Sequence, residues 1–309
     1  MNASNAEKVE AFWRGVLAGK FALDAARPAV RCDVDVELID LKDRKTGGEM
    51  RVDVAFQGPA SLPTLLELCD DDASRRRILE LRRFGLTEAR LRGDDVLVAR
   101  TGYTGEDVGF ELYVHPDRMQ KLWDAILEAG KGRGVIATAL GARDSTRTEA
   151  GFPLYGHELS GEFDIGPHGA GYPSFVKFHK PFFIGRDALL EREKARTNRI
   201  WRAKVTDAAA RPVRAGDTVV DVKGRFVGRV TSAAYAGAEQ IVLVWGDKSS
   251  LAKGAKVGIF PLPRDHKKLP PEPAKDDLKD GDAVLLPVAA EIQARFMSAT
   301  EKARRSYAK

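Results

Sequence analysis

Alternating apolar and polar residues predict a β-hairpin in the first half of the chain. The apolar run Val96-Leu97-Val98-Ala99 leads into a loop with glycines at 102, 105 and 109, and a second alternating run covers residues 110–115. Side chains alternate between the two faces of a strand, so Glu111 is predicted on the face opposite the apolar side chains. There it could accept two parallel N–H bonds from a flat heterocycle. The alternative, common for strands with one polar face, is that Glu111 is simply solvated.

The surrounding pattern predicts further strands and helices in one α+β layer. Residues from Pro116 onward place apolar side chains at helical spacing, which predicts an amphipathic helix. A helix is also expected after Gln57-Gly-Pro-Ala, capped by Ser61, and another over the arginine-rich residues 73–83. The expected strands are residues 35–41, 51–57, 86–92 and 96–101. Strands grouped with helices in this order predict an antiparallel sheet.

The C-terminal part has a different pattern. A charged helix is predicted to end near Arg196, and residues 199–260 alternate short apolar runs with glycine turns, which is typical of a small β-barrel. A Pro/Lys/Asp linker over residues 263–282, a last strand over 283–288 and a helical tail ending at Lys309 are expected to follow. The predicted domains are therefore residues 1–185 and residues 186–309.

Composition narrows the classes of protein that fit. The net charge of +5 is modest for 309 residues, and no basic block is interleaved with aromatic residues, so nucleic-acid binding is not expected. No apolar run reaches the length of a signal peptide core or a membrane span. Cys32 and Cys69 are far apart and have no metal-type spacing, which predicts reduced thiols in a cytoplasmic protein.

Several common catalytic motifs are missing from the sequence. It has no Walker loop, no Gly-x-Gly-x-x-Gly after a strand, no Cys-x-x-Cys and no nucleophile elbow. No metal site is predicted, and no residue is assigned a catalytic role; His157, in a turn, is expected to be structural. If the chain is an enzyme, an organic cofactor must carry the reacting group.

A second stretch, residues 141–159 (Gly-Ala-Arg-Asp-Ser-Thr-Arg-Thr-Glu-Ala-Gly-Phe-Pro-Leu-Tyr-Gly-His-Glu-Leu), combines with the glycine-loop motif into a family signature. Together they closely resemble the paired motifs of the glycine-cleavage T-protein (aminomethyltransferase) family, which also includes folate-dependent demethylases. The resemblance continues through residues 175–180 and 182–189 and covers roughly residues 51–260. It implies a folate-binding antiparallel sheet with helices, followed by a small barrel.

The resemblance also implies a cofactor and residues to hold it. Members of the family transfer a one-carbon unit to tetrahydrofolate. By motif position, Glu111 matches the carboxylate that binds the pterin edge, Tyr103 a tyrosine of the folate pocket, and Arg143 an arginine that contacts the cofactor. Arg143 and Arg147 are at i and i+4, on one face of a predicted helix. The alternative from spacing alone is that Asp144, at i+3 from Arg147, neutralises this pair of arginines locally.

Two differences from the family pattern affect what is expected of this chain. Val108 is an extra residue in the glycine-loop motif, and residues 1–50 resemble no part of the family's N-terminal portion. The chain is therefore expected to be the C-terminal part of a split enzyme whose N-terminal segment lies on a separate chain. Its one-carbon donor would be lipoyl H-protein or a small methylated substrate. The alternative is a non-catalytic folate-binding or assembly module.

Overall fold

The computed structural model describes residues 3–24, 26–159, 163–207, 211–261 and 286–304. The chain divides into two compact units: residues 7–143 form one, and residues 144–309 with the first six residues form the other. We call them the sheet unit and the barrel unit and describe each by itself. The domain division predicted after residue 185 stays a prediction.

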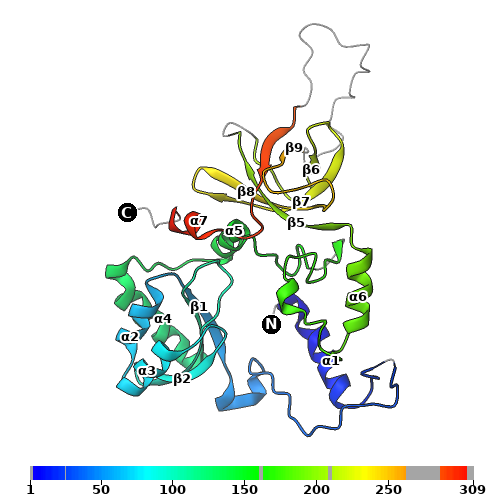
Figure 1. Ribbon diagram of the computed structural model, residues 1–309. Coiled ribbons are helices and arrows are strands. Elements are labelled where there is room, and N and C mark those ends of the chain that lie inside the picture. The colour runs from blue at the N-terminus through cyan, green and yellow to red at the C-terminus, as the bar shows by residue number, and fades with distance from the viewer. Residues whose placement is uncertain (1–2, 25, 160–162, 208–210, 262–285, 305–309) are drawn as a thin grey trace, which may run out of the picture. The chain divides into compact units, whose positions relative to one another are not determined.

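The sheet unit contains a four-stranded antiparallel sheet in the order β1-β4-β3-β2. Its strands are β1 (Val52–Gln57), β2 (Leu86–Leu91), β3 (Asp94–Ala99) and β4 (Gly109–Val114). Its helices are α1 (Ala6–Leu17, beginning at the unit boundary), α2 (Ser61–Leu68), α3 (Asp72–Glu80) and α4 (Pro116–Gly130), with 3-10 turns at Arg44–Glu49 and Lys131–Arg133. Figure 1 shows α2, α3 and α4 on one side of this sheet.

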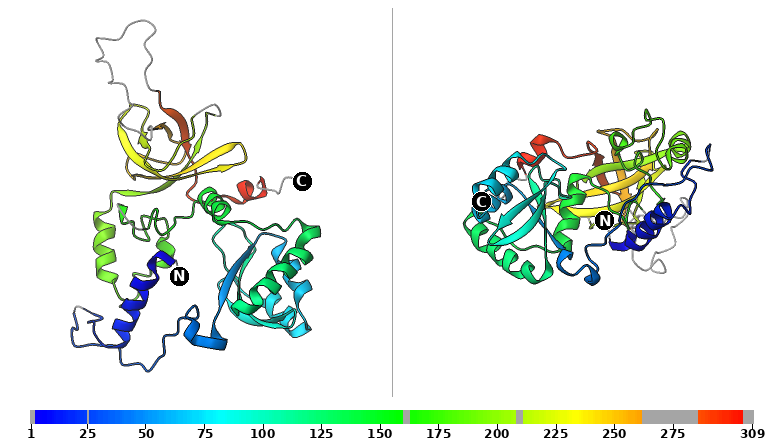
Figure 2. Two further views of the ribbon diagram at one scale, coloured as in Figure 1. Left: turned by 180° about the vertical axis from the view of Figure 1, so that it is seen from behind. Right: turned by 90° about the horizontal axis from the view of Figure 1, so that it is seen from below.

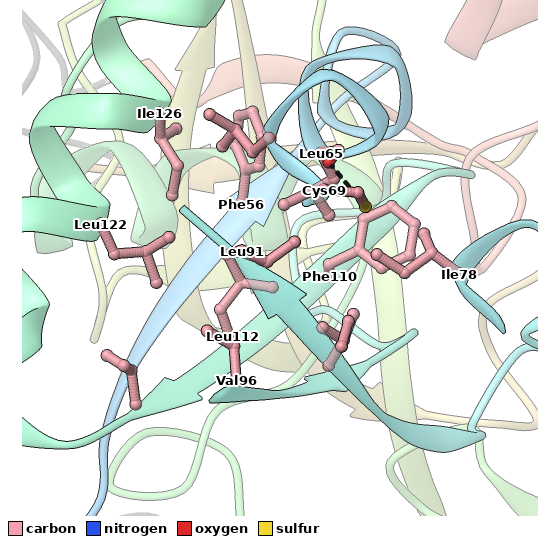
Figure 3. Packing of buried hydrophobic residues seen from close by; sticks show 14 of the residues in the cluster. Phe56, Leu65, Cys69, Ile78, Leu91, Val96, Phe110, Leu112, Leu122 and Ile126 are labelled. Carbon is pink, nitrogen blue, oxygen red and sulfur yellow. Dashed lines mark hydrogen bonds between the residues drawn. The ribbon is translucent and has the colours of Figure 1, made fainter. Parts of the chain in front are cut away.

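One face of the sheet forms the core of the unit. Phe56, Phe110 and Leu112 point toward the helices, where Leu65 and Leu122 meet them (Figure 3). All five are buried, four of them essentially completely. Because alternate strand residues face opposite ways, this packing places the intervening side chains on the other face, which we call the open face.

The barrel unit contains a closed six-stranded barrel in the order β10-β5-β8-β7-β6-β9, whose strands run from green to red in Figures 1 and 2. The strands are β5 (Asn198–Val205), β6 (Thr218–Val220), β7 (Phe226–Ala236), β8 (Glu239–Asp247), β9 (Lys256–Phe260) and β10 (Val288–Ile292). Helices α6 (Arg186–Ala195) and α7 (Ala299–Arg304) and 3-10 turns at Ala3–Asn5 and Pro173–Phe175 complete the unit. Helix α5 (Leu140–Ala150) crosses the boundary between the units.

The predicted fold class is confirmed: an antiparallel sheet with helices precedes a small barrel. The predicted hairpin is confirmed as well, since Leu97 of β3 is opposite Tyr113 of β4. The barrel turns at Gly216, Gly224 and Gly254 have φ angles of 95°, 75° and 83°, a region that favours glycine.

Three local predictions are wrong. Residues 35–41 form no strand, although their sequence alternates. Ser61 does not cap α2; it is the first helical residue, and its hydroxyl donates to the carbonyl of Gly58 at 2.6 Å. The last strand begins at Val288, where the predicted one ends. The predicted linker over 263–282 lies outside the described residues, as do residues 283–285 and the last five residues of the tail.

Candidate functional site

Glu111 stands near the middle of the open face. On its two neighbouring strands it is opposite Ala55 of β1 and Ala99 of β3. Directly opposite side chains are the nearest neighbours on one face of a sheet, so the carboxylate has only a methyl group on either side. This arrangement leaves room beside Glu111 for a ligand to approach its edge.

Burial and neighbouring charges set the electrostatics of this carboxyl group. Glu111 is half-buried, and burial is the largest cause raising its pKa, with a further contribution from the Asp53 carboxylate. Arg143 and a hydrogen bond from Tyr113 act in the opposite direction. The Tyr113 hydroxyl in turn has a raised pKa, through burial and then the charge of Glu111. Glu111 is thus a partly desolvated acceptor with one donor already in place.

A hollow of about 400 Å³ lies on the same face. Leu97, Ala99 and Tyr113 belong to the sheet itself and contribute part of its wall. Its other lining residues are Leu41, Phe84, Gly85, Leu86 and Thr101. Because Tyr113 both lines the hollow and bonds Glu111, the carboxylate lies at the border of a mostly apolar cavity. Pockets of this composition, with a few placed polar groups, are typical small-molecule sites.

Gln57 holds the glycine loop that contains Tyr103. Its side-chain nitrogen donates to the carbonyls of Thr101, at 3.2 Å, and Phe110, at 3.0 Å, so it joins the two ends of the loop. Its side-chain oxygen accepts a bond of 3.2 Å from the Thr104 hydroxyl. A Cβ atom at Gly102 would lie 1.8 Å from that oxygen, so glycine is required for this close approach.

The two arginines of α5 have different environments. Arg143 is exposed, and its charge lowers the pKa of Glu111. Arg147 is fully buried; it donates to Asp144 at 2.8 Å and to Glu158 at 3.1 Å. The alternative expectation that Asp144 neutralises Arg147 is therefore confirmed for that residue. The cofactor role of Arg143 stays a prediction.

His157 is exposed and contacts the buried Arg147 from outside. Its Nδ1 atom lies 3.1 Å from a guanidinium nitrogen of Arg147. A guanidinium only donates hydrogen bonds, so Nδ1 of His157 is the acceptor. This bonding agrees with the structural role expected for His157.

Sequence reasoning brought Glu111 and Arg143 to one region but missed three residues that shape it. Asp53 and Tyr113 act on the Glu111 charge, and Gln57 fixes the loop. Strand alternation already placed Tyr113 on the face of Glu111, so that residue could have been found. The contribution of Gln57 depends on bonds to residues 44 and 53 positions away, which local patterns do not reveal.

Comparison with known proteins identifies the family. Residues 31–180 match the family described as the GCVT N-terminal domain. Aminomethyltransferases from several bacteria align with this chain over 141 to 212 residues. The chain belongs to the glycine cleavage T-protein family.

Two such relatives show how far the similarity extends. The aminomethyltransferase of Alkaliphilus oremlandii is 40% identical over 194 residues, which are 63% of this chain and 45% of the relative. That of Streptomyces avermitilis is 41% identical over 212 residues, 67% of this chain and 55% of the relative. The chain thus spans about half the length of the curated T-proteins it matches.

A solved T-protein has a similar fold. The glycine cleavage system aminomethyltransferase T from Bartonella henselae superposes with a TM-score of 0.60 at 24% sequence identity, over 79% of this chain and 59% of that one. At this identity the likeness concerns the fold alone. It agrees with the sheet and barrel described above.

Other features of this T-protein family member offer no comparable site. A hollow of about 400 Å³ in the barrel unit is lined by Trp245 and several charged residues. Its arginines are paired locally: Arg192 with Asp164 at 3.2 Å and Arg196 with Glu193 at 2.7 Å. In the described ranges, no three His, Cys, Asp or Glu side chains could together hold a metal ion. Among these residues every helix is too short or too polar to span a membrane.

Proposed function

We propose that the open face of the sheet unit binds tetrahydrofolate and that the protein takes part in one-carbon transfer to it. The observation that carries this proposal is the half-buried carboxylate of Glu111 at the border of an apolar hollow, in a chain of the T-protein family. Bound tetrahydrofolate would supply the ring nitrogen that accepts the one-carbon unit. The protein's own residues bind and orient that ring.

Glu111 is the principal contact to the pterin edge in this proposal. A carboxylate has about four lone-pair sites, and the Tyr113 hydroxyl uses one of them. The others can accept N–H groups of a flat ring, and each such charge-assisted bond contributes about 1.5–3 kcal/mol when water is excluded. The methyl side chains of Ala55 and Ala99 leave space for this edge-on approach.

The hollow and its surroundings suit the rest of the ring. Leu97 and Ala99 offer an apolar wall to a ring face, and Tyr113 holds Glu111 in place at the border. We assign Arg143 to an anionic or carbonyl part of the cofactor and Tyr103 to a contact from the loop that Gln57 fixes. These two assignments follow from the positions of Arg143 and Tyr103 in the family motifs.

The donor and the partner are part of the same proposal. The chain spans about half of its curated relatives, and in this proposal a partner polypeptide contributes to the cleft. The one-carbon donor would be the aminomethyl group on a lipoyl H-protein or a small methylated compound. The reaction would take place in the cytoplasm. The same partial coverage favours a second candidate, a folate-binding or assembly module without transfer activity.

Titration of the chain with 5-formyltetrahydrofolate, a stable analogue, tests the proposal. Glu111→Gln keeps the shape but removes the charge, and we expect binding to weaken at least tenfold, or about 1.4 kcal/mol. Glu88→Gln is the matched control, because Glu88 is an exposed acid on the same sheet and face. Equal affinities for wild type and Glu111→Gln, or no binding with or without the remaining T-protein segment, would refute folate binding here. Binding without transfer in the reconstituted mixture would favour the second candidate.

A further inference from the structure

The segment before β1 has a strand-like sequence, but the structure does not pair it with another strand among the described residues. Residues 33–41 alternate acidic and apolar side chains, apart from the pair Leu38-Ile39. Val34, Val36 and Ile39 are 59%, 55% and 51% exposed. In Figure 1 the first strand arrow along the chain is β1 itself. An alternating run with exposed apolar side chains lacks the burial that normally stabilises a strand.

The outer edge of β1 is the nearest unpaired strand edge. β1 ends the sheet and pairs only with β4 among the described residues. The Arg51 N–H, just before β1, donates to the carbonyl of Leu41 at 2.7 Å, and the Gly58 N–H, just after it, donates to Val108 beside β4 at 2.9 Å. Backbone groups two residues apart on a strand point the same way. The backbone groups of residues 53, 55 and 57 therefore point outward, as that of Arg51 does.

We propose that residues 35–41, which we call the strap, close as a fifth strand on the outer edge of β1. The Arg51–Leu41 bond is the first rung of this hairpin and sets its register: 39 opposite 53, 37 opposite 55, and 35 opposite 57. The ion pair between Lys42 and Asp53, at 2.7 Å, holds the start of the hairpin together. Closure adds three bonded pairs, at 39/53, 37/55 and 35/57, beyond the Arg51–Leu41 bond.

This register places Val36, Leu38 and Asp40 on the face that packs against the helices, and Asp35, Glu37, Ile39 and Leu41 on the open face. Val36 and Leu38 come opposite Phe56 and Val54, on the face that packs against the helices. Val54 is only half-buried in the structure, so this end of the core has apolar surface left to cover. A register shifted by one residue would place Val36 and Leu38 on the open face and turn Asp35 and Glu37 toward the helices instead.

Closure changes the site on the open face. Glu37 comes opposite Ala55, whose other neighbour is Glu111. Asp53, Glu111 and Glu37 then form a group of three carboxylates, with only the methyl group of Ala55 between the two glutamates. The three carboxylates repel one another when no ligand is bound. A ligand that offers several N–H donors would stabilise this arrangement. We therefore assign Glu37 a specificity role, in which it accepts a second set of N–H groups; this part rests on the proposed function.

A disulfide trap tests closure without any ligand. In a Cys32→Ser background we would compare Glu37→Cys/Ala55→Cys with the control Leu38→Cys/Ala55→Cys. Opposed residues of a bonded pair have Cα atoms about 5.5 Å apart, within the range of a disulfide, whereas the control places the two sulfur atoms on opposite faces. Under mild oxidation, followed by mass spectrometry, we expect the 37/55 disulfide to form at least tenfold faster. Equal rates in the two variants would overturn the strap.

The same variants separate the strap from the proposed function. We expect 5-formyltetrahydrofolate to slow amide exchange of residues 35, 37 and 39 in the unmodified protein, in which Glu37 and Ala55 are present. Selective cross-linking without folate binding would keep the strap and refute the folate proposal. Folate binding that depends on Glu111, with equal cross-linking rates, would do the reverse.

Discussion

Replacing Glu158 with Gln should destabilise the barrel unit more than any surface charge change. Glu158 and Arg147 are both fully buried and lie 3.1 Å apart. Glu158 also accepts bonds from the hydroxyls of Thr231, at 2.8 Å, and Ser232, at 2.5 Å. Glu158→Gln keeps the volume but removes the charge that compensates Arg147.

The size of the effect follows from what Arg147 loses. Removing one partner of a buried ion pair costs about 3–5 kcal/mol, because the other charge stays buried. Asp144 still pairs with Arg147 at its more exposed side, so we expect the lower end, about 3 kcal/mol. With a urea m-value of about 2 kcal/mol/M, the unfolding midpoint should fall by about 1.5 M.

Hydrogen exchange of peptides from β7 and β8, measured as a function of urea concentration, reports on the barrel alone. The control is Glu239→Gln, which removes the partner of Lys204 from a largely exposed ion pair, and exposed pairs contribute at most about 1 kcal/mol. The double variant Arg147→Met/Glu158→Leu should recover part of the loss, since it leaves no buried charge behind. A midpoint for Glu158→Gln no lower than that for Glu239→Gln would refute the assigned role of the buried pair.

Three further outcomes are expected. Burial raises the pKa of Glu111 in the folded protein, so the folded protein binds this proton more tightly than the unfolded chain does. Stability therefore falls as pH rises from the unfolded-state pKa toward the folded-state pKa. Glu111→Gln should stabilise the sheet unit at pH 7 but not at pH 3, as measured by thermal melts. Gly102→Ala should weaken folate binding at least tenfold, measured by titration, because its Cβ would overlap the Gln57 amide. The Asp71 carboxylate accepts the Ser74 N–H at 2.6 Å, which lowers the pKa of Asp71 in the folded protein. The stability that this cap contributes is present above the unfolded-state pKa of Asp71 and is lost as pH falls through its folded-state pKa. Asp71→Asn should therefore flatten that part of the acid-unfolding curve.

The sequence was informative where structure depends on local pattern. Alternation around the glycine loop predicted the hairpin and the face of Glu111, and glycine turns at regular spacing predicted the barrel. Helix α4 was predicted because its apolar side chains repeat at helical spacing and Pro116 occupies its first turn.

Predictions failed where a partner decides the outcome. Residues 35–41 have the composition of a strand, but a strand forms only by pairing with a neighbour, and the alternation of one segment does not show whether a neighbour is available. Ser61 has the chemistry of a helix cap, yet the chain turns so that its hydroxyl meets the Gly58 carbonyl. Both cases depend on the path of the backbone rather than on residue type.

The two alanines beside Glu111 have a consequence for engineering the ligand preference of this protein. Ala55 and Ala99 are the residues directly opposite Glu111, and the size of their side chains limits the space next to the carboxylate. Replacing either with a β-branched residue would narrow this space while leaving every polar contact intact. Size exclusion and hydrogen bonding can therefore be altered independently on this surface.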